Sequence, residues 1–192
     1  VLFRSLEFEI TVPDTIPEKI VRVNDLILKR SKLHLLNAKK AKDVKPYLPG
    51  FWDLIEESYA DLFGTIPFTE KQKKFYTDQY FGFLIPEYTK FIINEKNEIV
   101  AVGLIFPSFT EALRKANGRK FPFGLLYMLL ATKKPTKLDF YLIGVKKEYI
   151  GNGVISIMMN EINKNAIKNG IKCCETSGEL EDNKAVQDMW RH

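Results

Sequence analysis

Alternating hydrophobic and polar positions mark two β-strands in the middle of the chain. Tyr88 to Ile93 and Ile99 to Phe106 are rich in β-branched and aromatic residues, and the polar stretch Asn94-Glu95-Lys96-Asn97 separates them. Two such runs joined by a short polar turn are typical of a β-hairpin. We therefore expect these two strands to pair in antiparallel fashion.

The last third of the chain alternates strands with helices. Leu138 to Val145 carries few charges and predicts a central strand, a helix is expected from Gly151 to Asn169, and Ile171 to Thr176 predicts another strand. Strands joined through a helix in this way lie parallel, with a right-handed crossover. A last helix is expected from Glu179 to Trp190. The predicted fold class is therefore α/β, with a mixed sheet that contains the hairpin and the parallel pair.

The segments outside these strands give weaker patterns. The first thirteen residues alternate loosely and indicate an edge strand or a tail, and apolar residues at helical spacing predict a helix that ends near Arg30. We interpret residues 1–31 as an N-terminal tail and helix, the remnant of an upstream domain, and residues 32–192 as the main domain. The apolar run from Phe121 to Ala131 predicts a buried helix.

Composition and charge limit the classes of function. The 192 residues carry a net charge of +5, but the lysines are scattered, which favours solvated faces over a nucleic-acid surface. Two cysteines and two histidines exclude a disulfide scaffold and leave little material for a metal centre, so we expect no metal. The longest apolar run is shorter than the roughly 20 residues of a bilayer span, and the first residues lack a signal-peptide pattern. We expect no membrane partner and a cytoplasmic location.

The connection between the central strand and the long helix has the strongest signal for ligand binding. Gly151-Asn152-Gly153 opens the helix, whose first amides have no partner within the helix. Glycines let a ligand approach that backbone closely, and the helix dipole adds positive potential, so the loop suits a phosphate or pyrophosphate. The alternative is a tight turn that needs glycine only for its dihedral angles. The dinucleotide fingerprint and the phosphate-loop motif are both absent.

The stretch from Val145 to Val154 resembles the acyl-CoA pyrophosphate loop of the GNAT superfamily of N-acyltransferases. Gly153 matches the core glycine of the family pattern, and Gly151 and Asn152 match the small and polar residues before it. Two positions depart from the pattern, because Ile150 stands where the family has Gln or Arg and Ile155 stands where it has Gly or Ala.

A second match lies downstream, where the family has an asparagine and, further on, a tyrosine that often protonates the departing thiolate. Asn183 matches the asparagine, whereas Trp190 stands in place of the tyrosine. The resemblance covers about Lys32 to His192, and the last two strands of the family would lie beyond His192. We therefore interpret the chain, which also lacks an initiator Met, as a fragment cut at both ends, and expect the strand from Ile171 to Thr176 to lack an outer neighbour.

The resemblance implies an acyl-CoA-dependent N-acyltransferase, with acetyl-CoA as co-substrate and a small-molecule or peptide amine as acceptor. In that family the two parallel strands splay apart around the acyl-pantetheine arm, and a free backbone amide polarises the thioester carbonyl. The residues implied to bind the co-substrate are Ile143, Gly144, Val145, Ile150, Gly151, Asn152, Gly153, Val154, Ile155 and Asn183.

Acyl transfer to an amine needs a base near the attacking nitrogen. By strand alternation, Asp139, Tyr141, Ile143 and Val145 are expected to share one face. Asp139 and Glu175 are the candidate catalytic bases, each with the alternative of a solvated carboxylate or a buried ion pair. Tyr141 is the candidate for protonating the thiolate, with the alternative of a core tyrosine.

Two other functions stay open on the sequence alone. A GNAT-like module that has lost catalysis, and that binds acyl-CoA or serves as a structural domain, is motivated by Ile150, Ile155 and Trp190. A basic module that binds another anion such as RNA would show a steep salt dependence of its affinity. The run from Phe121 to Ala131 has the alternative role of lining an acceptor pocket.

Overall fold

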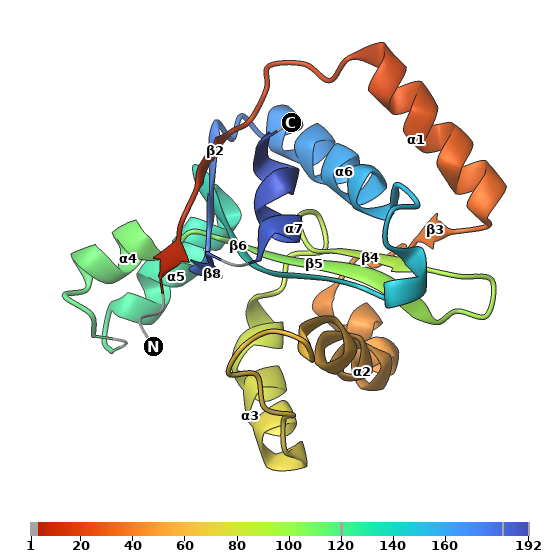
Figure 1. The fold of residues 1–192 in the computed structure, drawn as a ribbon. Coiled ribbons are helices and arrows are strands. Elements are labelled where there is room, and N and C mark those ends of the chain that lie inside the picture. Colours follow the sequence, from red (N-terminus) through yellow and green to blue (C-terminus); the bar gives the residue numbers. More distant parts are fainter. Residues whose placement is uncertain (1–3, 120, 182, 192) are drawn as a thin grey trace.

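The computed structural model describes residues 4–119, 121–181 and 183–191, and its centre is a six-stranded mixed sheet (Figure 1). The strands follow the order β2-β7-β6-β5-β4-β3 across the sheet. Their bounds are Glu9–Thr11 for β2, His34–Leu35 for β3, Lys90–Ile93 for β4, Ile99–Pro107 for β5, Lys137–Val145 for β6 and Cys173–Thr176 for β7. Two short strands, β1 (Ser5–Leu6) and β8 (Glu179–Leu180), pair with each other in a separate sheet.

Helices cover both faces of the large sheet (Figure 1). One face carries α1 (Glu18–Ser31), α6 (Val154–Lys168) and α7 (Lys184–Gln187), and the other carries α2 (Leu48–Tyr59) and α3 (Glu70–Tyr80). The connection from β5 to β6 forms α4 (Thr110–Lys115) and α5 (Gly124–Lys133), which extend from one end of the sheet. Short 3-10 turns span Ala41–Tyr47, Phe81–Phe83, Lys147–Tyr149 and Asp188–Arg191. Each helix layer packs a separate hydrophobic core against the sheet, so β5 is buried along its whole length.

The predicted hairpin and the predicted parallel pair are both confirmed. β4 and β5 pair in antiparallel fashion, and β6 pairs with β7 in parallel fashion over four residues of each strand. α6 makes the connection between β6 and β7, as the glycine loop and the apolar helix pattern predicted. The fold class is therefore the predicted α/β class with a mixed sheet.

The prediction that the last parallel strand lacks an outer neighbour is wrong. β2, from the N-terminal segment, pairs with β7 in antiparallel fashion and forms that edge of the sheet. The Val12 amide donates to the Lys172 carbonyl at 3.0 Å, and the Thr176 amide donates to the Phe8 carbonyl at 2.9 Å. An edge strand was one of the two expectations for the first thirteen residues, but its partner lies about 160 residues away and no local pattern specifies it.

The N-terminal helix α1 also joins the main body of the protein. Its Ile27 and Leu28 side chains pack against the core on the α6 face of the sheet. Asn24 is buried, and its side-chain oxygen accepts a hydrogen bond of 2.9 Å from the Ser156 hydroxyl in α6. Residues 9–31 of this chain are thus packed on the sheet that residues 32–192 form. Their origin in an upstream domain stays a prediction.

Two predictions about helices are wrong. The helix expected from Phe121 to Ala131 begins at Gly124, and it is not buried, since Phe121 is 69% exposed and Leu126 is 51% exposed. Most residues of this helix are apolar, so the pattern indicates no single buried face, and no further layer of the described residues covers it at its end of the sheet. The helix expected from Glu179 to Trp190 consists instead of β8, the short helix α7 and a 3-10 turn.

The pairing of β2 with β7 gives a test in which two neighbouring residues act as a matched pair. Hydrogen bonds of an antiparallel strand alternate between its edges, so the Ile10 amide faces β7 and the Thr11 amide faces away. Ile10→Pro removes a donor to β7 and should lower the free energy of unfolding by about 1–3 kcal/mol. Thr11→Pro should be tolerated, because proline fits the outer side of an edge strand.

Thermal denaturation measures both variants, with a shift of about 2–4 °C expected for each kcal/mol in a chain of this size. Equal losses in the two variants would contradict the observed pairing of β2.

Candidate active site

The strands β6 and β7 run side by side only over the first half of β6. Their pairing ends with Phe140 opposite Thr176. The next residue, Ser177, donates to the Phe140 carbonyl from both its amide, at 3.0 Å, and its hydroxyl, at 2.7 Å, and the chain then turns away into β8. From Tyr141 to Val145, β5 is the only strand that pairs with β6 among the described residues. One edge of β6 is therefore open over this stretch.

A β-bulge in β6 changes which side chains share a face. Leu104 of β5 pairs with Leu142, but the next residue, Ile105, pairs with Phe140, so Tyr141 is an extra residue. The prediction of one shared face for Asp139, Tyr141, Ile143 and Val145 is wrong, because the bulge reverses the alternation after Tyr141. Ile143 and Val145 pack with the core under α6, whereas the Tyr141 ring lies on the other face, with its centroid 5.0 Å from that of Phe106.

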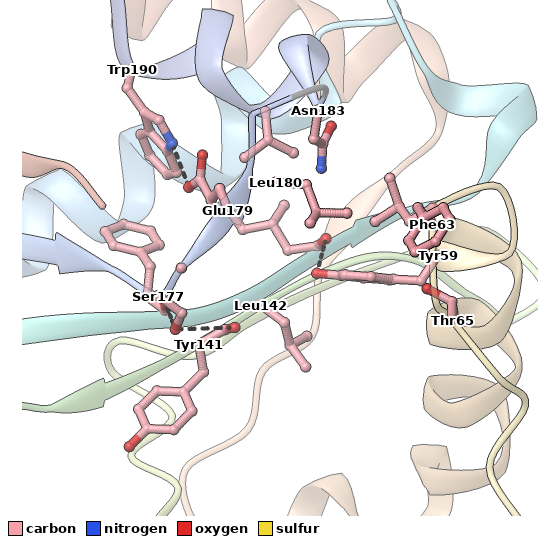
Figure 2. Close-up of a pocket in the computed structure, with 15 residues that line it drawn as sticks. Tyr59, Phe63, Thr65, Tyr141, Leu142, Ser177, Glu179, Leu180, Asn183 and Trp190 are labelled. Atoms are coloured by element: carbon pink, nitrogen blue, oxygen red, sulfur yellow. Dashed lines mark hydrogen bonds between the residues drawn. The ribbon is translucent and has the colours of Figure 1, made fainter. Parts of the chain in front are cut away.

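The open edge of β6 borders a cavity of about 310 Å³, here called the splay cavity (Figure 2). Its walls come from the end of α2 and the loop after it, from β6, and from the segment that follows β7. The polar side chains among its lining residues are Tyr59, Thr65, Tyr141, Ser177, Glu179, Asn183 and Trp190. Asn183, expected from the sequence to bind a ligand, is thus placed at this cavity.

Backbone amides point into the open edge at every second residue of β6. The Lys146 amide donates to the Val100 carbonyl of β5 at 2.9 Å. Because strand hydrogen bonds alternate between the two edges, the amide of Gly144 also points to β5, and those of Ile143 and Val145 point to the open edge. Of the three residues expected in this segment, Ile143 and Val145 therefore offer donors there, and Gly144 does not.

Two hydroxyls from α2 bind the carbonyls on the same edge. The Tyr59 hydroxyl donates to the Ile143 carbonyl at 3.2 Å, and the Ser58 hydroxyl donates to the Val145 carbonyl at 3.2 Å. Burial raises the pKa of Tyr59, so its hydroxyl keeps its proton. The acceptors of the open edge are thus satisfied by the protein, while a ligand that accepts hydrogen bonds can use the donors.

The glycine loop before α6 requires both of its glycines. Gly151 and Gly153 have φ angles of +83° and +75°, which side chains rarely adopt. Their surroundings differ. A Cβ atom at Gly151 would meet nothing within 4 Å, whereas one at Gly153 would lie 2.6 Å from Cδ1 of Ile27 in α1. The backbone is therefore accessible at Gly151, and α1 packs directly against it at Gly153.

The other loop residues divide into exposed and packed positions. Ile150 and Asn152 are exposed, Val154 is buried, and Ile155 packs against the core. The Ile157 amide is the first in α6 that bonds to a carbonyl of the helix turn, at 3.1 Å to Gly153. The amides of residues 154–156 come before it and have no partner within the helix. The helix therefore begins with free donors and positive potential at the loop.

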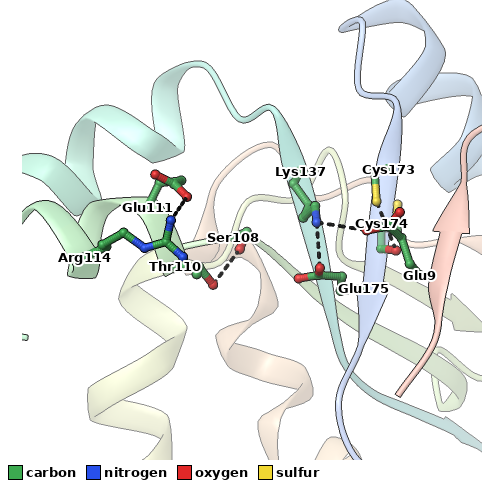
Figure 3. Close-up of polar contacts among 9 residues, drawn as sticks. All are labelled: Glu9, Ser108, Thr110, Glu111, Arg114, Lys137, Cys173, Cys174 and Glu175. Atoms are coloured by element: carbon green, nitrogen blue, oxygen red, sulfur yellow. Dashed lines mark hydrogen bonds and ion pairs between the residues drawn. The ribbon is translucent and has the colours of Figure 1, made fainter. Parts of the chain in front are cut away.

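The two carboxylates expected as bases differ in their surroundings. Glu175 accepts from the Lys137 ammonium at 2.6 Å, and the same ammonium lies 3.3 Å from Glu9, so Glu175 is held in an ion pair (Figure 3). Asp139 is half-buried, and its Oδ1 atom is buried without a hydrogen-bond partner among the described residues. Burial raises the pKa of Asp139, which favours its protonated form.

These carboxylates line a second cavity of about 490 Å³, here called the acidic cavity. Its charged lining residues are Glu7, Glu9, Asp139 and Glu175. Tyr141 and Ser177 line both the acidic cavity and the splay cavity. Glu9 and Glu175 share the single Lys137 ammonium, so the acidic groups at this cavity outnumber that cation and favour a cationic ligand there.

Glu179 is a polar group of the splay cavity that the sequence did not single out. Its Oε1 atom accepts a hydrogen bond of 2.8 Å from the Trp190 indole, and its Oε2 atom is buried without a partner among the described residues (Figure 2). Burial raises the pKa of Glu179. The sequence placed Glu179 at the start of a helix, and its contact with Trp190 depends on the fold of β8 against the following turn, which has no local signal.

A third cavity of about 570 Å³ lies between the α2–α3 loop and β6 and is here called the apolar cavity. It shares Tyr59, Thr65, Tyr141 and Leu142 with the splay cavity. None of the helices in the described ranges combines the length and the hydrophobicity that a bilayer span requires. Within the same ranges, no three His, Cys, Asp or Glu side chains gather closely enough to hold a metal ion.

Comparisons with solved structures identify the fold. A GCN5-related N-acetyltransferase from Sphaerobacter thermophilus matches 94% of this chain and 45% of its own, at 14% identity and a TM-score of 0.53. One from Kribbella flavida matches 84% of this chain and 81% of its own, at 14% identity and a TM-score of 0.50. The C-terminal domain of a putative lysylphosphatidylglycerol synthetase from Agrobacterium fabrum matches 99% of this chain and 52% of its own, at 8% identity and a TM-score of 0.50.

The predicted GNAT-type fold is therefore confirmed. The chain spans about half the length of the Sphaerobacter and Agrobacterium structures. No model of a protein family matches the sequence, and no curated protein matches it.

The contact between α1 and the glycine loop can be isolated by comparing the two glycines. Gly151→Ala should cost only the strain of a positive φ angle, about 1–2 kcal/mol of unfolding free energy. Gly153→Ala should cost about 1–3 kcal/mol more, because its methyl group would overlap Ile27. In an Ile27→Ala background the extra cost should disappear. Urea denaturation of Gly151→Ala and Gly153→Ala, each with and without Ile27→Ala, would measure the difference. An extra cost that persists without the Ile27 side chain would contradict the packing of α1 on the loop.

Proposed function

We propose that the chain is an acyl-CoA-dependent N-acyltransferase domain, which moves an acyl group from coenzyme A to a primary amine. The observation that carries the proposal is the open edge of β6, where the amides of Ile143 and Val145 point away from β5 and Ile143 lines the splay cavity. A thioester carbonyl there would accept a hydrogen bond from one of these amides. Such a donor stabilises the negative charge that develops on the carbonyl oxygen when an amine attacks.

The glycine loop fits the pyrophosphate of coenzyme A. The amides of residues 154–156 are free of helix partners, and the space around Gly151 is open. Anions bind well at such a helix start. The side chains of Ile150 and Ile155 supply no charge, so binding at the loop depends on the backbone, and Asn183 would contact the pantetheine arm from the other side of the splay cavity.

The acceptor amine would approach through the acidic cavity, which meets the splay cavity at Tyr141 and Ser177. A cationic amine suits its carboxylates. Of the two predicted bases, Asp139 is the better candidate, because Glu175 is held by Lys137 and Asp139 has an oxygen without a partner among the described residues. Its raised pKa also makes it a better proton acceptor than an ordinary aspartate.

Protonation of the departing thiolate has two candidates in the splay cavity. Tyr141, expected from the sequence, lines the cavity, but its ring lies on the face of β6 toward Phe106. Glu179 also lines the cavity, and burial raises its pKa, so it would keep a proton to a higher pH than an exposed glutamate. Trp190 holds Glu179 in place and is not itself an acid.

A second candidate function is a GNAT-like module without catalysis. The contact of Ile27 with Gly153 favours it, because α1 covers part of the backbone that a pyrophosphate would approach. Release of free thiol from acyl-CoA in the presence of amines distinguishes the two functions. Acyl-CoA binding without thiol release for any amine tested would favour the module without catalysis.

Two variants of one residue test the binding of acyl-CoA at the loop. Gly151→Asp would place a carboxylate near the pyrophosphate, and a charge pair at that range is worth about 1–4 kcal/mol at a protein surface. We expect at least about a fivefold loss of acetyl-CoA affinity. Gly151→Asn has nearly the same size, and Asn and Asp both tolerate a positive φ better than other side chains, so it is the matched control.

Calorimetric titration of acetyl-CoA into the wild type and both variants measures the difference, with circular dichroism as the control for folding. Equal affinities of the Asp and Asn variants would contradict anion binding at this loop.

A further inference from the structure

We propose that the apolar cavity beside the reaction centre binds the acyl chain of the donor, so that the preferred co-substrate is an acyl-CoA with a chain longer than acetyl. This inference rests on the proposed acyltransferase function. Its basis is the chemistry of the cavity walls and the place where the cavity meets the open edge of β6.

The walls of the apolar cavity offer no free charged group among the described residues. Glu56 is the charged residue in its lining, and its carboxylate is engaged by the Lys73 ammonium at 3.0 Å and by the Phe68 amide at 3.1 Å. The Tyr59 hydroxyl is committed to the Ile143 carbonyl. The rest of the lining is mainly aliphatic or aromatic: Ile55, Ala60, Ile66, Pro67, Phe68 and Leu142. A polar ligand would lose its water there without gaining partners, which costs free energy.

The apolar cavity is joined to the splay cavity at the bulge in β6. Tyr141 and Leu142 line both, and Figure 2 shows their side chains on the same side of β6. The amide of Ile143, the next residue along the strand, faces the splay cavity and is a donor proposed for the thioester carbonyl. A chain that leaves this carbonyl can therefore pass Leu142 into the apolar cavity.

Apolar space continues beyond the apolar cavity toward α3. A smaller cavity of about 270 Å³ shares Ile55, Phe68, Tyr141 and Leu142 with the apolar cavity. Its other walls are mainly aromatic, and the rings of Trp52 and Tyr76 contact that of Phe68 at centroid distances of 5.3 and 5.8 Å. Ligand pockets in proteins commonly have volumes of about 300–1,000 Å³, so this space suits a chain of several methylenes better than a methyl group.

The acceptor does not compete for this space, because its cavity has the opposite chemistry. The acidic cavity meets the splay cavity at Ser177, on the β7 side of the bulge. Carboxylates line it, and a cationic amine is the ligand they favour. The two cavities thus separate a charged acceptor from an apolar chain, with Tyr141 lining both.

Calorimetric titration of acetyl-CoA and octanoyl-CoA into the whole chain tests the proposal without knowledge of the acceptor. Each fully buried methylene lowers Kd about fourfold, so octanoyl-CoA should bind at least about tenfold more tightly even if only part of the chain is buried. Ile66→Asp places a charge at the exposed rim of the apolar cavity and should remove most of that preference. Its acetyl-CoA affinity should stay unchanged.

Leu126→Asp is the matched control, because Leu126 is an exposed leucine of α5 that lines none of these cavities. It should keep the preference for octanoyl-CoA, which excludes chain binding at exposed apolar surface in general. Equal affinity for the two acyl-CoAs, or loss of the preference in Leu126→Asp but not in Ile66→Asp, would overturn the assignment of this cavity and leave the acyltransferase proposal standing. Failure of both acyl-CoAs to bind would overturn the proposed function and this inference with it.

Discussion

The parting of β6 from β7 after Phe140 is the constraint on which the rest of the site depends. Ser177 marks the point of separation, because its amide and its hydroxyl both donate to the Phe140 carbonyl and the chain then leaves β6 for β8. β6 continues to pair with β5 up to Val145. The amides and carbonyls on its other edge are those that a neighbouring strand would normally bind. The protein thus contains a row of oriented donors that a ligand can use in place of a strand.

The residues around the open edge of β6 favour different chemical groups of a ligand at different places. Tyr59 and Ser58 occupy the carbonyls, so the edge favours acceptors over donors. The bulge at Tyr141 turns the next residue, Leu142, toward α2, and the cavities on the two sides of this point have apolar walls in one case and carboxylates in the other. A thioester with an apolar chain and a cationic amine is a pair of substrates that fits this division.

The sequence predicted the parts of the fold that local patterns encode. The hairpin and the β6-α6-β7 unit follow from alternation, from helical spacing and from the glycine loop, and both are confirmed. The pairing of β2 with β7 and the packing of Ile27 on Gly153 join distant segments, and the bulge at Tyr141 depends on register with β5. The motif therefore indicated the loop residues as candidates, whereas no local pattern indicated Glu179, whose place at the splay cavity depends on long-range contacts.

Hydrogen exchange of single amides in β6, followed by nuclear magnetic resonance, tests the open edge most directly. Without ligand, the amides of Ile143 and Val145 should exchange much faster than those of Leu142 and Gly144, which bond to β5. Addition of an acyl-CoA should slow exchange at Ile143, at Val145 or at both. Equal and strong protection of all four amides before ligand is added would contradict the open edge, and unchanged exchange at saturating acyl-CoA would contradict its use as the thioester site.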